Sequence, residues 1–248
     1  MSSFLLKLVG IICMTMDHAR LLIFNTSDFS WMEHIGRLAF PIFAFQIVVG
    51  YRKTHDLKKY ILRLLIFAVI SEVVYKWMIW LCTKDLQQTM AYWNVYWTFV
   101  LGLISLRIIN DAKLKHIYKF LIVAAICILF SIVYVDYSFY GIGIMLAYYY
   151  LFPFKDGEVK NRKAKGIGLA VLLLALAIIF AAFINIRTGA LVPFYNLIPY
   201  AIGTFIGSVI PFLYNGKKGL SNKVIKWMFY IYYPLHIAVL CLINIFIH

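Results

Sequence analysis

Long hydrophobic runs, separated by short polar clusters, follow one another along the whole chain. A run of about 17–25 apolar residues is long enough to cross the hydrocarbon layer of a membrane as an α-helix. The pattern predicts such helices at residues 4–24, 35–51, 60–82, 94–109, 118–135, 137–153, 166–186, 194–214 and 227–247. The loops between them are short and the chain shows no internal repeat. We therefore expect an all-α fold, a polytopic transmembrane bundle of nine spans that forms a single domain over residues 1–248.

Composition supports a membrane protein. Hydrophobic residues make up 64% of the 248 residues and charged residues only 14%, whereas an ordinary soluble domain is about half apolar. The first hydrophobic segment carries Lys7, Asp17 and His18 and has no small-residue cleavage site. We therefore expect it to be a retained helix and not a signal peptide. The expected location is a cell membrane, which in bacteria is the cytoplasmic membrane.

The basic residues alternate along the chain in a way that predicts topology. Of the 24 Lys and Arg residues, 19 fall in alternate loops and ends. These are Lys7, Arg52, Lys53, Lys58, Lys59, Arg63, Arg107, Lys113, Lys115, Lys119, Lys155, Lys160, Arg162, Lys163, Lys165, Lys217, Lys218, Lys223 and Lys226. Because cytoplasmic loops are enriched in Lys and Arg, the N-terminus is predicted to be cytoplasmic and the C-terminus outside. The basic residues that give the net charge of +14 are thus expected to contact the lipid bilayer. Nucleic acid is not an expected partner.

Titratable residues within the first hydrophobic segment are the first candidates for function. Lys7 and His18 are eleven positions apart, a rise of about 16 Å along a helix. Charged side chains are rare at membrane depth and often functional. We consider His18 a candidate general base and Asp17 a residue that tunes a catalytic or structural neighbour. The alternative is an internal polar pair that only fixes helix packing.

Cations near the second and third segments are the next candidates. Arg37 lies near the outer end of the second predicted helix. It could anchor that helix at the membrane surface, or it could hold a carboxylate or an oxyanion. Lys59 and Arg63 follow on the cytoplasmic side. They could be ordinary topology signals, or they could bind the phosphates of a cofactor, since clustered cations suit polyanions.

Polar residues at the outer ends of the middle segments are candidates for substrate binding. Glu72 and Lys76 are spaced as a favourable helical ion pair, for which a structural role is the simpler explanation. Asn94 opens the fourth predicted helix, and Asp136 and Tyr140 stand at the junction of the fifth and sixth. We consider these three residues candidates for contact with a substrate. Asp136 could instead cap a helix.

The final segment contains a second deep histidine. Tyr233 and His236 lie within the last predicted helix, and we consider His236 a candidate catalytic residue and Tyr233 a candidate substrate contact. A lone histidine in an apolar helix is often only hydrogen-bonded, but two in one small protein favour function. The chain has no GxSxG, HExxH, Walker or CxxC motif, and the spacing of His18, His34 and His236 does not support a metal site.

Three sequence blocks resemble one family of membrane proteins. They are LKLVGIICMTMDH, IGRLAFPIFAFQIVVGY with KKYILRLLIFA, and FYIYYPLH. In this order they resemble the TraX family, named for the enzyme that N-acetylates the pilin of F-type conjugative pili, and the similarity extends from end to end. More distantly, the Lys7 to His18 spacing resembles that of the acyltransferase-3 membrane enzymes, which have arginine in place of Lys7. TraX relatives often carry a glutamate where this chain has Val49.

The resemblance implies acyl transfer from acetyl-CoA. Lys7, Lys59 and Arg63 would then hold the phosphates of the donor on the cytoplasmic side. His18 would deprotonate an amine or hydroxyl of the acceptor, which could be a peptide, a pilin-like protein or a glycan of the cell envelope. Arg37, Tyr233 or His236 would stabilise the developing oxyanion.

Two other classes of function remain compatible with the sequence. A transporter or flippase would use a polar site near the middle of the membrane, although such proteins often show inverted repeats that this chain lacks. An assembly partner in the cell envelope would need no catalytic residues. Among the three, the resemblance favours the acyltransferase.

Overall fold

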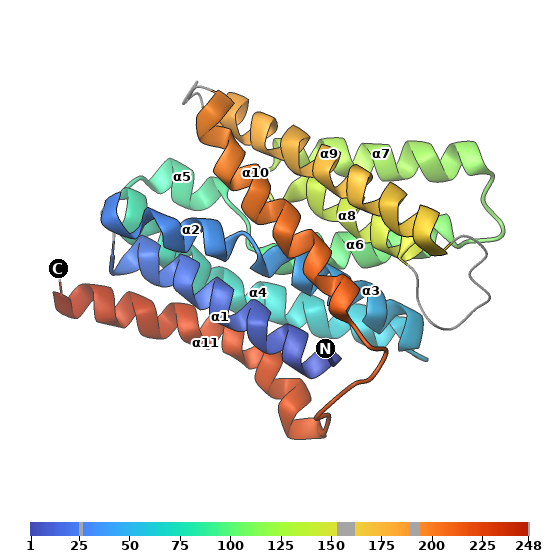
Figure 1. Ribbon diagram of the computed structural model, residues 1–248. Coiled ribbons are helices and arrows are strands. Elements are labelled where there is room, and N and C mark those ends of the chain that lie inside the picture. Colours follow the sequence, from blue (N-terminus) through green and yellow to red (C-terminus); the bar gives the residue numbers. More distant parts are fainter. Residues whose placement is uncertain (25–26, 153–161, 189–193, 248) are drawn as a thin grey trace. The chain divides into compact units, whose positions relative to one another are not determined.

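The computed structural model describes residues 1–24, 27–152, 162–188 and 194–247, and these residues are helices joined by short loops. The α-helices are α1 (Ser3–Leu22), α2 (Ser30–Gly36), α3 (Ala39–Lys53), α4 (Leu57–Thr83), α5 (Leu86–Ala91), α6 (Val95–Ile109), α7 (His116–Ile132), α8 (Ser138–Leu151), α9 (Arg162–Thr188), α10 (Phe194–Val209) and α11 (Lys223–Ile247). Two 3₁₀ turns, η1 (Ser27–Phe29) and η2 (Ile210–Leu213), accompany them. No β-strand occurs among the described residues, so the predicted all-α class is confirmed (Figure 1).

The chain divides into two compact units, each of which combines segments that are distant in sequence. Unit 1 comprises residues Met1–Gln46 and Ala147–Ile225, and unit 2 comprises Ile47–Leu146 and Lys226–His248. The division falls inside α3, α8 and α11, so each of these helices contributes to both units. The prediction of one domain over the whole chain stays a prediction.

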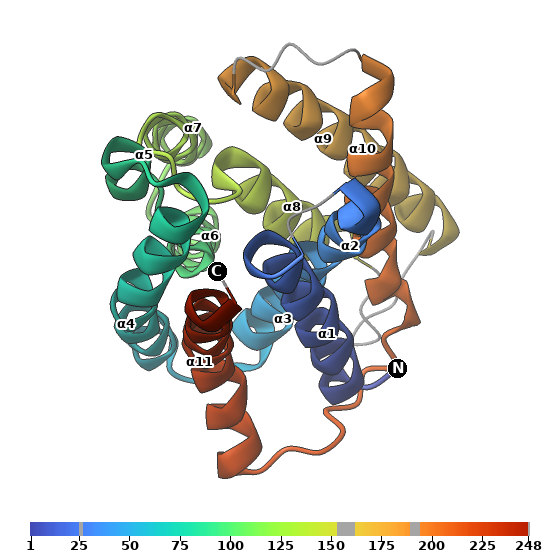
Figure 2. The same cartoon turned by 90° about the vertical axis from the view of Figure 1, so that its left-hand side faces the viewer.

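Unit 1 is built on contacts of α1 with α2, of α2 with α10, and of α10 with α9, which lie side by side (Figures 1 and 2). Its aromatic core surrounds Phe45 of α3, whose ring lies 5.3 Å from that of Tyr148 and 4.6 Å from that of Phe152. The Tyr148 hydroxyl donates a hydrogen bond to the Ser208 carbonyl at 2.7 Å. This bond ties the end of α8 to α10.

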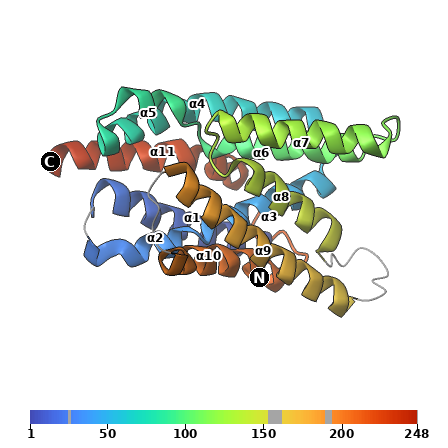
Figure 3. The same cartoon turned by 90° about the horizontal axis from the view of Figure 1, so that it is seen from above.

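Unit 2 is built on α4, which packs against α5 and α6, and on α7, which packs against α6 (Figure 3). The last helix joins this group through the Tyr96 hydroxyl of α6, which donates to the Tyr230 carbonyl of α11 at 3.0 Å. Phe67 of α4 stacks on Tyr230 with ring centroids 5.3 Å apart. An aromatic contact therefore joins α4 and α11 in the same region where the hydrogen bond joins α6 and α11.

Each hydrophobic segment predicted from the sequence coincides with helical structure. Among the described residues, four helical segments are long and apolar enough to cross a membrane, namely Ser30–Lys53, Leu57–Thr83, Gly166–Ile186 and Lys223–Ile247, and three apolar helices are shorter. Several long apolar helices are thus present, as expected for a multi-pass membrane protein. Residue 153 of the predicted sixth span and the basic residues Lys155 and Lys160 lie outside the described residues.

The second predicted span is interrupted, and a proline accounts for the interruption. The sequence predicted one helix over residues 35–51, but α2 ends at Gly36 and α3 begins at Ala39. Pro41 has no amide hydrogen to donate to the carbonyl four residues earlier, and its ring clashes with that carbonyl. That carbonyl belongs to Arg37, which therefore occupies the break between the two helices.

Several helices expose apolar side chains where a soluble protein would place polar ones. No residue of α7 is buried among the described residues, and on α4 the side chains of Leu62, Val69 and Val73 are exposed by 55%, 61% and 73%. A soluble monomer rarely exposes an extended apolar surface of this kind. Contact with lipid hydrocarbon explains these faces, because helices satisfy their backbone polar groups internally.

The contact between α10 and the α2–α3 break depends on glycine, and this gives a prediction. A Cβ atom on Gly207 would lie 2.6 Å from the Cα and 2.8 Å from the carbonyl oxygen of Leu38, so the backbone would have to move. We expect Gly207→Ala to lower the free energy of unfolding by about 1–3 kcal/mol. Gly168→Ala on α9 is the matched control, since a Cβ there meets nothing within 4 Å. Thermal unfolding in detergent compares the two variants, and equal melting temperatures would contradict the prediction.

Candidate functional site

The first candidate site is a cluster of charged side chains between α1 and α2. The Arg37 Nη2 atom lies 3.4 Å from Asp17 Oδ1 and 3.6 Å from Glu33 Oε1. The second carboxylate oxygen of Glu33 lies 3.6 Å from Arg20 Nη1. The Arg37 and Asp17 side chains are only 18% and 14% exposed. Arg37 therefore forms an ion pair with Asp17, and the role proposed for it from the sequence stays a prediction.

Close packing of helices places this charged cluster. A Cβ atom on Gly36 would overlap the Asp17 side chain, so α2 approaches α1 closely only because residue 36 is glycine. On the other side, a Cβ on Gly203 of α10 would lie 2.6 Å from the His34 carbonyl oxygen. Small residues commonly permit such contacts between membrane helices. The two glycines thus hold α2 between α1 and α10.

Two histidines of unit 1 lie in or beside this cluster. His18 follows Asp17 on α1 and is partly buried. His34 lies on α2 between Glu33 and Gly36, and its Nδ1 atom is buried without a hydrogen-bond partner among the described residues. From the sequence, His18 is a candidate general base, whereas His34 has no catalytic role assigned to it. The cluster also contains Glu33, which the sequence analysis did not consider, although its position four residues before Arg37 is the spacing of a helical ion pair.

Lys7 lies on the same helix as His18, three turns nearer the N-terminus, and is partly buried. The Ser2 hydroxyl caps this helix by accepting a hydrogen bond from the Leu5 amide. The two ends of the first helix therefore carry different groups, as the sequence predicted. Lys7 lies near the N-terminal end. His18 lies near the C-terminal end, beside the Asp17–Arg37 ion pair.

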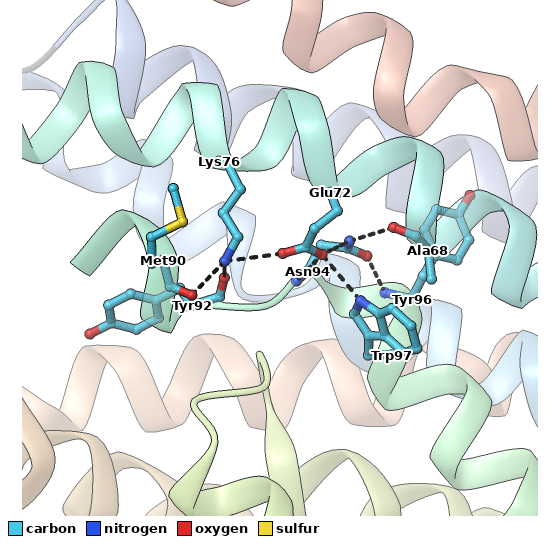
Figure 4. Close-up of polar contacts among 8 residues, drawn as sticks. All are labelled: Ala68, Glu72, Lys76, Met90, Tyr92, Asn94, Tyr96 and Trp97. Atoms are coloured by element: carbon cyan, nitrogen blue, oxygen red, sulfur yellow. Dashed lines mark hydrogen bonds and ion pairs between the residues drawn. The ribbon is translucent and has the colours of Figure 1, made fainter. Parts of the chain in front are cut away.

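The second candidate site is a polar network in unit 2 that centres on Glu72 of α4 (Figure 4). One carboxylate oxygen of Glu72 lies 3.2 Å from Lys76 Nζ. The other accepts hydrogen bonds from the Asn94 side-chain amide and, at 3.1 Å, from Trp97 Nε1. Asn94 also donates to the Ala68 carbonyl at 2.9 Å. The Glu72–Lys76 pair predicted from spacing is present, and it belongs to a larger network than the spacing showed.

Lys76 extends this network toward α5. Its ammonium group donates hydrogen bonds to the carbonyls of Met90, at 2.9 Å, and Tyr92 (Figure 4). It also lies 5.2 Å from the centre of the Trp93 ring, which favours a cation–π contact. Lys76 therefore binds the end of α5 and the loop that follows it, and its charge is offset by Glu72.

Asn94 caps α6, and the loop before α8 lies next to it. The Asn94 side-chain oxygen accepts from the Tyr96 amide at 3.0 Å, and the residue is fully buried. The Trp93 carbonyl accepts from the Asp136 amide at 3.0 Å, and the Thr98 hydroxyl donates to the Asp136 carbonyl. Asn94 and Asp136, two of the substrate-binding candidates, are thus adjacent in unit 2.

Tyr140, the third of these candidates, lies on α8 one turn after the loop and is fully buried. Its ring centroid lies 6.2 Å from that of Tyr137. Tyr137 has a positive φ of 59°, an uncommon backbone conformation for a bulky residue. The loop that carries Asp136 is therefore constrained by backbone contacts on one side and aromatic packing on the other.

Tyr233 and His236 on α11 complete the candidates of unit 2. The Tyr233 ring meets that of Tyr96 edge to face at 5.2 Å, and its hydroxyl interacts with the Val95 amide and the Asp136 charge. The His236 Nδ1 atom lies 2.8 Å from the Tyr232 carbonyl oxygen. A neutral imidazole with this contact carries its proton on Nδ1 and its lone pair on Nε2.

The two cytoplasmic cations of unit 2 differ in their surroundings. Lys59 is exposed and pairs with Asp56 at 3.1 Å, and hydrogen bonds from Lys59 hold the pKa of Asp56 below its usual value. Arg63 lies 5.8 Å from the centre of the Tyr60 ring and hydrogen-bonds the Tyr230 side chain. Arg63 Nε is buried and has no hydrogen-bond partner among the described residues.

The candidates therefore form two groups. Unit 1 holds Lys7, Asp17, His18 and Arg37, of which Asp17 and Arg37 are in contact. Unit 2 holds Lys59, Arg63, Asn94, Asp136, Tyr140, Tyr233 and His236, of which Asn94, Asp136 and Tyr233 lie near one another. The roles assigned to these residues from the sequence stay predictions.

Comparison with known proteins identifies relatives over nearly the whole chain. The family described as "TraX protein" matches residues 2–244. A relative from Dichelobacter nodosus, described as a probable fimbrial assembly protein, FimC of serogroup H1, is 32% identical over 255 residues, which cover 99% of this chain and 97% of that protein. No solved structure matches the chain. A match of this extent, together with the helical membrane architecture, shows that the chain belongs to the TraX family.

Proposed function

We propose that the protein is a membrane-bound acyltransferase that moves an acetyl group from acetyl-CoA to an amine or hydroxyl of an acceptor at the membrane. The observation that carries this proposal is the match to the TraX family over residues 2–244. The family is named for an enzyme that acetylates pilin. The presence of several long apolar helices supports the same conclusion, because such an enzyme works within the membrane.

The proposed acceptor is a pilin-like protein. The name of the relative from Dichelobacter nodosus refers to the assembly of fimbriae, which are built from pilins. An N-terminal or side-chain amine of such a subunit would be an acetyl acceptor held at the membrane before assembly. A peptide or an envelope glycan with a free amine or hydroxyl is the alternative acceptor.

The proposed chemistry assigns the proton transfer to His18. The imidazole accepts the proton of the attacking amine or hydroxyl while the new bond to the acetyl carbon forms. The bond from that carbon to the CoA sulfur breaks, and the thiolate takes up the proton from the imidazole. General base catalysis of this kind contributes about 10²–10⁴ in rate.

Asp17 and Arg37 have a supporting role in this proposal. Asp17 pairs with Arg37 and holds its guanidinium beside the helix that carries His18. A guanidinium near the reacting carbon stabilises a developing oxyanion. In unit 2, His236 and Tyr233 are proposed to contact the acceptor, together with Asn94, Asp136 and Tyr140.

The cytoplasmic cations suit the phosphates of the donor. Arg63 offers a buried Nε–H that has no partner among the described residues, and a guanidinium with spare donors is well matched to a phosphate. Lys59 adds an exposed ammonium one turn earlier on the same helix, and Lys7 is the cation proposed for the same purpose in unit 1. Acetyl-CoA would supply the activated thioester.

The proposed topology follows from the distribution of charge. Nine spans with a cytoplasmic N-terminus and an external C-terminus would place Lys7, Lys59 and Arg63 on the side where acetyl-CoA is found. His18 would then lie toward the outer side, where an exported acceptor arrives. This arrangement would carry an acetyl group from a cytoplasmic donor to an acceptor across the membrane.

A transfer assay tests the proposed function. The purified protein in detergent is mixed with acetyl-CoA and a pilin-derived peptide, and free thiol and acetylated peptide are measured together. We expect both products to appear in equal amounts and only when the protein is present. A protein that releases no thiol with any amine or hydroxyl acceptor, and that instead moves a solute into sealed vesicles without CoA, would be a transporter.

A further inference from the structure

A buried side-chain amide on α3 has an unpaired N–H donor and lies against the first turn of α1. Gln46 is 7% exposed, and its neighbours Phe45 and Ile47 are buried apolar residues. The Ser3 hydroxyl donates a hydrogen bond to Gln46 Oε1. Gln46 Nε2 is buried and has no hydrogen-bond partner among the described residues. An amide donor left unpaired in apolar surroundings destabilises a protein unless something binds it.

The contacts between α1 and α3 place Lys7 at the same helix–helix interface as the Gln46 amide. Ser3 contacts Gln46, and a Cβ on Gly10 would lie 3.0 Å from the Phe43 ring. On α1, Lys7 is four residues from Ser3 and three from Gly10, so all three share one face of the helix. Lys7 therefore stands on the face of α1 that meets α3, between the level of Gln46 and the level of Phe43.

The backbone amides in the first turn of α1 are not available to bind a ligand here. The amides of Ser3 and Phe4 donate to the carbonyls of Lys217 and Lys218 at 2.9 Å and 3.0 Å, and the Leu5 amide donates to the Ser2 hydroxyl. The first-turn donors are thus already engaged. The same backbone bonds bring two exposed cations, Lys217 and Lys218, to this end of the helix.

We propose that Gln46 binds an amide group in the pantetheine arm of the CoA donor, while Lys217 and Lys218 bind its phosphates. An amide ligand suits Gln46, because a neutral buried donor is matched by a carbonyl better than by an anion that must lose its hydration. Pantetheine presents amides between the phosphates and the thioester. The pantetheine arm would lie along the interface between α1 and α3, starting at Lys217 and Lys218 and passing Lys7.

This proposal rests on the proposed function and refines its donor site. It adds Gln46, Lys217 and Lys218 to Lys7, and these four residues lie within unit 1. Gln46 is a positioning residue in this scheme, since it holds the arm at a distance from the thioester. Its contribution should therefore appear in binding of the donor before any transfer occurs.

A binding experiment with two probes tests the proposal. Titration calorimetry measures the affinity of the full-length protein in detergent for CoA and for S-acetylpantetheine, which keeps the amides and lacks the nucleotide. We expect Gln46→Met to weaken both probes by about threefold to tenfold. We expect Lys217→Ala with Lys218→Ala to weaken CoA only, and less so at high salt. Ser208→Ala, which removes a hydroxyl bonded within α10 at 2.8 Å, is the control and should bind as the wild type does.

A second variant keeps the test decisive if Gln46→Met does not fold. Gln46→Leu removes the amide donor with a differently shaped side chain, and it adds neither a charge nor an acidic proton. Unchanged affinity of either folded Gln46 variant for S-acetylpantetheine would overturn the proposal. A wild-type protein that binds neither probe would instead contradict the proposed donor itself, so the two failures are distinguishable.

Discussion

The His18→Gln variant is expected to lose acetyl transfer by about 10²–10⁴-fold while it folds and binds the donor as the wild type does. Glutamine keeps a polar side chain of similar reach on α1, but it cannot accept a proton in the reaction. The loss should therefore fall on the rate of transfer at saturating acetyl-CoA. The measurement is thiol release with a pilin-derived peptide as acceptor, alongside the melting temperature in detergent.

His34→Gln is the matched control for this experiment. His34 is a second histidine of the same unit, on α2 beside the cluster of Asp17 and Arg37. Because we assign it no part in the chemistry, His34→Gln should retain most of the transfer rate. If His34→Gln lost transfer and His18→Gln kept it, the base would be His34 and our assignment of the proton transfer would be wrong.

The helices of this protein were predictable because hydropathy reports them directly. The predicted segment at residues 60–82 is α4, and the one at 227–247 lies within α11. The short helix α5 was missed because LQQTMA has no hydrophobic run. A local signal for α5 did exist, since Asp85 caps it by accepting hydrogen bonds from the amides of Gln87 and Gln88. These bonds also hold the pKa of Asp85 below its usual value.

Contacts between distant residues were much harder to predict. The spacing of Glu72 and Lys76 was enough to expect an ion pair within one helix. The spacing contained no information about Asn94 and Trp97, which reach Glu72 from α6. Such contacts depend on how α4 and α6 pack, and packing is set by side-chain shape along both helices. In the same way, Asp17 and Arg37 were both selected from the sequence, but not as partners.

The residues that sequence analysis missed share a physical explanation. Gln46 is a neutral side chain in an apolar helix, so neither charge nor a motif draws attention to it, and only its unpaired amide in the folded protein does. Glu33 and Arg20 lie close to the ends of hydrophobic segments, where charges are ordinary. The contacts of Glu33 with Arg20 and with Arg37 become apparent only when α1 and α2 are seen to pack together.

The Arg37→Met variant is expected to be destabilised by about 3–5 kcal/mol, because it leaves the Asp17 carboxylate buried without its partner. The two side chains are 18% and 14% exposed, and their charged atoms lie 3.4 Å apart. Asp17→Asn alone should cost less, since Arg37 keeps Glu33 at 3.6 Å. Chemical unfolding in detergent measures both single variants.

The double variant Asp17→Asn with Arg37→Met distinguishes two causes of the stability loss in Arg37→Met. One is the lost attraction between the two side chains, and the other is the buried Asp17 charge left without a partner. Removing both charges should recover most of the stability that Arg37→Met loses, because no buried carboxylate then remains unpaired. Arg107→Met is the matched control, since Arg107 pairs with Asp111 at 3.5 Å but is 57% exposed. Exposed pairs contribute about 0–1 kcal/mol, so this variant should stay near the wild type. A double variant no more stable than Arg37→Met would show that Arg37 stabilises the fold through contacts other than its charge on Asp17.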